Sequence, residues 1–69
     1  MKPVSGARFA RIVERHGWNL LRISGSHHIH GKPGETARLS IPIHGAKPLK
    51  AGLQRHLMKI AGLADADLG

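Results

Sequence analysis

The sequence predicts an α+β fold in which two helices cover one face of a three-stranded antiparallel sheet, in the order α-β-β-β-α. Two segments near the ends of the chain carry apolar residues at helical spacing. Three short segments between them have the β-branched or alternating pattern of strands, and turn signals rich in Gly and Pro separate them. With 69 residues and no repeat or linker, the chain is expected to form one small domain over residues 1–63.

The first helix is predicted within "SGARFARIVERHG", residues 5–17. Ser5 suits the N-cap position, because its hydroxyl can accept a hydrogen bond from an unpaired backbone N–H. Gly17 can adopt the left-handed conformation that commonly ends a helix. Apolar side chains recur at i, i+3, i+4 and i+7 and form one stripe: Phe9, Ile12, Val13 and the stem of His16.

Three strands are predicted, at residues 18–24, 27–32 and 37–43. Gly25 and Ser26 form a tight turn between the first two, and "KPGE" at 32–35 marks the second turn. In the third strand Leu39, Ile41 and Ile43 alternate with polar residues or proline, as in a half-buried strand. Pro42 cannot donate a ladder hydrogen bond, so it should lie at an edge or at the end of its strand.

The second helix is predicted within "LKAGLQRHLMKIAG", residues 49–62, with Gly62 ending it. Its apolar face consists of Leu49, Leu53, Leu57 and Ile60. Residues 64–69, "ADADLG", contain two of the four acids, and we expect them to form a flexible acidic tail.

The charge favours a polyanionic partner. Eleven Lys and Arg stand against four acids, for a net charge of +7, and before residue 60 only Glu14 and Glu35 oppose them. Nucleic acid is the favoured partner, ahead of an acidic protein or a membrane surface. No apolar run approaches the roughly 20 residues of a membrane span. Without cysteine or a signal-peptide pattern, the cytoplasm is the expected compartment.

"GSHHIH", residues 25–30, gathers three of the six histidines. Alternation along a strand predicts that Ile29 points inward together with His27, and that His28 and His30 face solvent. That orientation depends on the register of the strand, which a bulge near Gly25 could alter.

Three interpretations of these histidines compete. Imidazole titrates near neutral pH, so it can accept a proton from a ribose 2′-hydroxyl or give one to a leaving oxygen, as metal-independent RNA cleavage requires. The same residues could be polar side chains on a wet sheet face. A metal site of His28, His30 and His44 is disfavoured, because only Glu35 could complete it and the positive field repels a dication. No cofactor is expected.

Other candidates flank this stretch. Lys47 and Lys50 lie at the start of the second helix, where unpaired N–H groups favour a phosphate, although they could equally be solvated loop lysines. Trp18 could stack on a base, but packing against a helix is the favoured role. His16 and His56 lie on or beside helical stripes and are expected at the edge of the core.

These residues resemble the HicA family of toxins, the YcfA-like proteins of type II toxin–antitoxin modules. The similarity covers residues 3–63 and is carried by "VSGARFARIVERHGW", "LLRISGSHHIH" and "LSIPIHGAKPLKAGLQRHLMKIAGL". It implies a double-stranded-RNA-binding-domain-like fold and an mRNA interferase, an endoribonuclease that cuts transcripts. It also implies a catalytic histidine in the pattern Gly-Ser-x-His, which falls on His28, and leaves His27 a supporting residue at best.

The resemblance further implies a HicB-type antitoxin partner, through which the only DNA contact is made. In the mechanism we expect, His28 is the general base on the 2′-hydroxyl, Arg22, Arg38 or Lys32 neutralises the developing charge, and His30, His44 or water supplies a proton. The residues expected to contact RNA are Ser26, His30, Arg22, Lys32, Arg38, Lys47 and Lys50. The alternatives are a non-catalytic RNA-binding module on the same fold and an interaction protein that binds an acidic partner.

Overall fold

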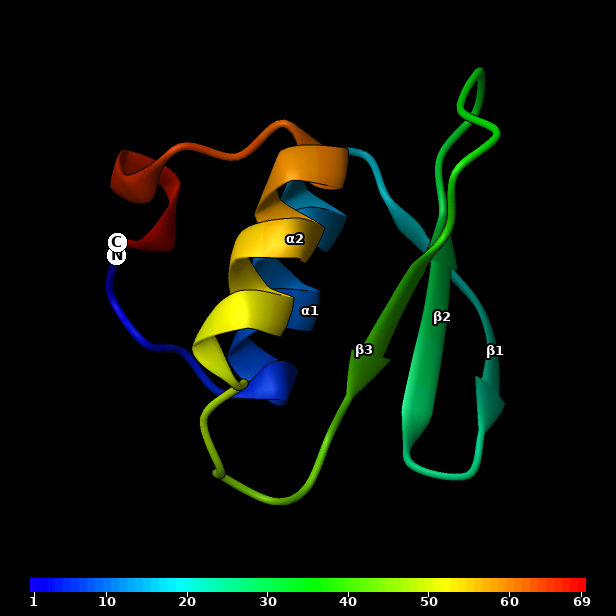
Figure 1. Ribbon diagram of the computed structural model, residues 1–69. Coiled ribbons are helices and arrows are strands. Elements are labelled where there is room, and N and C mark those ends of the chain that lie inside the picture. The colour runs from blue at the N-terminus through cyan, green and yellow to red at the C-terminus, as the bar shows by residue number, and fades with distance from the viewer.

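The computed structural model describes residues 1–69 and has the predicted α+β architecture (Figure 1). Two helices lie side by side and a three-stranded antiparallel sheet stands against them. The elements, in chain order, are α1 (Gly6–Arg15), β1 (Asn19–Ser24), β2 (His27–Gly31), β3 (Leu39–Pro42), α2 (Ala51–Ala61) and the short 3₁₀ helix η1 (Asp65–Leu68).

Helix α1 begins and ends as the sequence predicts. The backbone N–H of Arg8 donates to Ser5 Oγ over 3.1 Å, which satisfies one of the unpaired donors of the first turn. After the helix, Gly17 adopts φ 92°, a left-handed conformation that favours glycine. Phe9 and Val13 are completely buried, whereas His16 is exposed, so the expected place of its stem at the core was wrong.

The strands follow one another across the sheet in the order β1-β2-β3. The two-residue turn at Gly25 (φ 59°) and Ser26 joins β1 to β2. The register shifts between Leu20 and Arg22, so that Leu21 is the extra residue of a bulge in β1.

The pairing of β2 with β3 decides which face each strand residue occupies. His28 lies directly opposite Ile41 and His30 directly opposite Leu39, and both apolar partners are fully buried. Directly opposite residues share a face, so His28 and His30 point toward the helices. Ile29, opposite Ser40, lies on the other face. The expected orientation is therefore inverted: Ile29, the one aliphatic side chain of β2, lies on the face away from the helices, and two histidines occupy the helix-facing positions.

Helix α2 is closed by Gly62 at φ 70°, as predicted. Its buried face includes Leu57, as expected, and also Met58 and the polar Gln54. The Gln54 amide accepts a hydrogen bond from Val4 N at 3.2 Å and donates one to Lys2 O at 2.7 Å. This side chain holds the segment before α1 against α2.

Residues 64–69 contradict the expectation of a flexible tail. They form η1, whose Leu68 is completely buried in the core. Asp67 Oδ2 accepts a hydrogen bond from Ala64 N at 2.7 Å, and Arg8 donates to the Leu68 carbonyl at 3.1 Å. The expectation failed because it weighed the two acids and overlooked the single leucine that anchors the segment.

Candidate nucleic-acid interface

His28 lies near the start of β2, close to the turn that joins β1 to β2. It is half-buried, and its cross-strand neighbours are Ile23 on β1 and Ile41 on β3. Its imidazole therefore lies on the helix-facing side of the sheet, at the end where β1 and β3 end and β2 begins. His28 was predicted to be exposed to solvent, but its side chain is only partly exposed, and it lies on the opposite face of the sheet from the one expected.

His30, two residues further along β2, has a different environment. Its side chain is fully buried, and Nε2–H donates to Glu14 Oε2 of α1 over 2.8 Å. The other ring nitrogen, Nδ1, is buried without a hydrogen-bond partner. The expectation that His30 contacts RNA or supplies a proton was therefore wrong, because the ring is enclosed between the sheet and α1.

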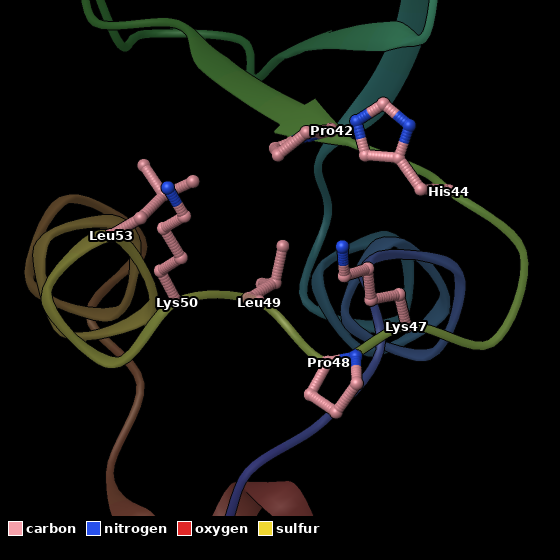
Figure 2. Close-up of a pocket in the computed structure, with 7 residues that line it drawn as sticks. All are labelled: Pro42, His44, Lys47, Pro48, Leu49, Lys50 and Leu53. Carbon is pink, nitrogen blue, oxygen red and sulfur yellow. The ribbon is translucent and has the colours of Figure 1, made fainter.

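A cleft of about 360 Å³ opens at the same end of the sheet as His28. It lies between the end of β3 and the start of α2, and three of its side chains can carry positive charge: His44, Lys47 and Lys50. In Figure 2 the two lysine amines project from the connecting segment toward the Pro42 side of the cleft, where the His44 ring also lies. The complete lining is Pro42, His44, Lys47, Pro48, Leu49, Lys50 and Leu53.

Backbone pairing joins this cleft to the histidine strand. Pro42, which lines the cleft, is the register partner of His27. The next residue, Ile43, donates its N–H to the carbonyl of Ser26 over 2.8 Å. Ser26, His28 and the cleft are thus parts of one end of the molecule, brought together by the β2–β3 ladder.

The start of α2 adds to the positive character of this cleft. Lys50 is the N-cap and makes no side-chain capping bond, and the first turn contains no acidic residue. The first N–H groups of a helix lack intrahelical acceptors and carry partial positive charge. Lys47 and Lys50 therefore lie near the start of α2, and their role in binding a phosphate stays a prediction.

The remaining predicted cations lie elsewhere. Arg22 is opposite Ile29, on the face of the sheet away from His28. Lys32 and Arg38 line a second hollow with Leu21, after the far end of β2. The structure therefore does not bring Arg22, Lys32 or Arg38 together with His28. The sequence could not show this, because strand alternation leaves the face of each residue open until the register is known.

Two features of this region were missed or left open by the sequence. Glu14 was noted only as one of few acids, yet it is the partner of His30. Its position on α1 carried no signal for that contact, which joins residues 16 apart in the chain. Trp18 is buried, in agreement with packing as its favoured role, and Lys32 Nζ lies 6.0 Å from its ring centroid.

No group of three or more His, Asp or Glu side chains converges in a geometry suited to a metal ion. No helix of the chain has both the length and the apolar character required to cross a membrane.

Comparison with protein families gives one match. The family described as "HicA toxin of bacterial toxin-antitoxin" matches residues 6–63, from the first residue of α1 to just beyond α2. A comparison with curated proteins found no match. The matched span includes His28, Ser26 and the whole of the cationic cleft.

Proposed function

This chain belongs to the HicA toxin family of bacterial toxin–antitoxin systems, and from that membership we propose that it is an endoribonuclease that cleaves mRNA in the cytoplasm. We further propose that a HicB-type antitoxin restrains it and supplies any DNA contact. The observation that carries the enzymatic proposal is a half-buried histidine, His28, at the same end of the sheet as a cleft with two lysines.

In this proposal Lys47 and Lys50 hold the RNA backbone at the cleft. Both side chains are exposed and neither forms an ion pair with an acid. A phosphate between them would gain two charge-assisted contacts in addition to the partial charge at the start of α2. Ser26 lies at the edge of this region and completes the polar surface around the scissile group.

His28, in its neutral form, is the general base. It takes the proton from a ribose 2′-hydroxyl, and the resulting oxygen attacks the adjacent phosphorus. The P–O5′ bond breaks, which leaves a 2′,3′-cyclic phosphate on one fragment and a free 5′-hydroxyl on the other. The lysines offset the extra negative charge of the phosphorane as it forms.

The leaving 5′-oxygen needs a proton. His30 cannot supply it from its enclosed position against Glu14. His44 is exposed and lines the cationic cleft, so it is the histidine placed to act as the acid, with water as the alternative donor.

The test is digestion of a defined RNA by the purified protein in the presence of EDTA. We expect cleavage by the wild type, and a loss of about 10²-fold or more in rate for His28→Ala with RNA binding retained, because only the proton-transfer group is removed. The matched control is His27→Ala, which removes the neighbouring imidazole from the other face of the same strand and should keep most of the activity.

Three outcomes would overturn this assignment. Equal cleavage by wild type and His28→Ala would remove His28 from the chemistry. Cleavage abolished by EDTA would contradict metal independence. RNA binding by the wild type without any cleavage would favour the alternative, a non-catalytic RNA-binding module.

A further inference from the structure

β1 is exposed along its whole length. All six residues, Asn19–Ser24, are exposed, and three of them are large apolar side chains: Leu20 at 44%, Leu21 at 53% and Ile23 at 56%. A single exposed leucine is ordinary on a protein surface, but a row of three on one edge strand is not. Apart from Met1, no other large apolar residue of the chain is as exposed.

The two edges of the sheet differ. β3, at one edge, is short, ends at Pro42 and packs against both helices. β1, at the other edge, stands furthest from the helices (Figure 1) and contains neither proline nor lysine. Natural proteins usually protect a free edge with such residues or with a covering element, since its outward N–H and C=O groups can pair with another strand. The bulge at Leu21 and the charge of Arg22 are the only such devices on β1.

The apolar side chains of β1 lie on both sides of that edge. Ile23 is opposite His28 and Leu20 opposite His30, so both lie on the helix-facing side. Leu21 lies over Gly31, where a Cβ atom would come within 2.7 Å of its Cδ1. A strand that paired with β1 would therefore find apolar neighbours on each face.

The net charge of the chain indicates which kind of partner would pair with the free edge of β1. A second copy would bring another +7 molecule, with its own Arg22, against the same edge, which like-charge repulsion opposes. Membership of a toxin–antitoxin family supplies a different partner, an antitoxin. A segment of that partner with apolar residues and an acid to face Arg22 would complement the edge in both shape and charge.

We propose that β1 is the docking edge for an extended, acidic segment of the antitoxin, which adds a fourth strand to the sheet. Such a strand would pair its backbone with the outward N–H and C=O groups of β1 and cover Leu20 and Ile23. It would also lie directly beside Ile23, the neighbour of His28. If His28 is the active group, as proposed above, strand addition would close the approach to it from the β1 side.

The test measures binding of the antitoxin encoded beside this chain's gene, with His28→Ala as the background so that cleavage plays no part. Adding Ile23→Lys should weaken the complex by about tenfold or more, because a charge replaces a buried apolar contact. Ala66→Lys in η1 is the control: it adds the same positive charge at an exposed residue outside β1, and affinity should not change. Unchanged circular dichroism would show that both variants are folded.

Backbone pairing is measured separately by amide hydrogen exchange. The amides of β1 that point away from β2 should become protected in the complex and stay unprotected in the free toxin. Wild-type affinity of the Ile23→Lys variant, or unchanged exchange along β1, would overturn the proposal. So would a dimer of the free toxin that Ile23→Lys dissociates, since the occupant would then be a second copy. None of these readouts depends on RNA cleavage, so a failed nuclease assay would leave this test intact.

Discussion

At the scale of single residues, His28 and His30 of β2 have different environments although they share a face. His30 is fully enclosed, and the Glu14 carboxylate is its one hydrogen-bond partner. His28 is half-buried and makes no side-chain hydrogen bond within the protein. The bonded ring of His30 links β2 to α1, whereas the ring nitrogens of His28 remain available for a hydrogen bond to a bound molecule. The difference arises from position along β2, since Glu14 of α1 bonds to His30 near the end of the strand, whereas His28 lies near its start.

The His30–Glu14 contact predicts the effect of a substitution on stability. Glu14→Ala would leave Nε2–H of His30 buried without an acceptor, which should lower the free energy of unfolding by about 1–3 kcal/mol. Glu14→Gln keeps an acceptor oxygen and should lose less. Urea denaturation followed by circular dichroism measures both.

The matched control is Arg11→Ala on the exposed side of the same helix, which we expect to change stability by about 0.5 kcal/mol or less. If Glu14→Ala proved as mild as this control, the contact would contribute little, and His30 would have to be satisfied by water.

At the scale of secondary-structure elements, the cleft depends on how closely α1 approaches the end of β3. A Cβ atom on Gly6 would lie 2.0 Å from the Pro42 carbonyl oxygen, so only glycine permits this contact. The segment before α1 is also tied to the other side of the cleft, because Leu49 N–H donates to the Val4 carbonyl over 2.9 Å. Val4, just before α1, and Gly6, at its start, thus hold Leu49 and Pro42, two residues that line the cleft.

This contact predicts opposite results for the same substitution at two glycines. Gly6→Ala should destabilise the protein by about 1–3 kcal/mol, because the obstructing atoms belong to the backbone and cannot rotate away. Gly52→Ala, in the first turn of α2 with nothing within 4 Å, should stabilise by about 0.4–1 kcal/mol through the lower entropy of the unfolded chain. Thermal unfolding of both variants checks the signs: an unchanged or raised Tm for Gly6→Ala would contradict the close packing at Gly6, and a lowered Tm for Gly52→Ala would contradict the open space at Gly52.

At the scale of the whole molecule, few of the positive charges are paired with acidic side chains. The two ion pairs of the chain are made by histidines, so none of the eleven Lys and Arg side chains is paired with an Asp or Glu side chain. Their field extends over the surface and attracts a polyanion from several directions. In the proposed function, Lys47 and Lys50 at the cleft then determine where a phosphate is held. An experiment should therefore distinguish the long-range attraction by the net charge from the direct phosphate contacts of the cleft lysines.

The salt dependence of RNA binding distinguishes these two contributions. The magnitude of the negative slope of log K against log salt should fall by about 1.4 when Lys47 and Lys50 are both changed to Gln, at about 0.7 for each phosphate contact on a single strand. Lys59→Gln, in the last turn of α2, is the control and should leave the slope nearly unchanged. Fluorescence anisotropy with His28→Ala as the background gives both values, and equal slopes for all variants would place the phosphate contacts elsewhere.

Much of this architecture follows from local chemistry. The helix boundaries at Ser5, Gly17 and Gly62 and the turn at Gly25 depend on capping and on backbone conformations that neighbouring residues specify. The order of elements follows from periods of hydrophobicity, which are properties of short windows. The net charge follows directly from the composition, and the attraction to a polyanion follows from the net charge. For these features the chain carries its own information.

The grouping of residues into a site depends on contacts between distant segments. Alternation showed that His28 and His30 share a face, but pairing with Leu39 and Ile41 on another strand set which face it is. Pairing with β1 placed Arg22 on the opposite face from His28, and pairing with β3 left His28 at the same end of the sheet as the cleft with Lys47 and Lys50. Lys32 and Arg38 lie after the other end of β2. Burial of Leu68 ordered a segment whose acids suggested a tail. Register and burial are properties of the assembled fold, because each requires partners that are far away in the chain.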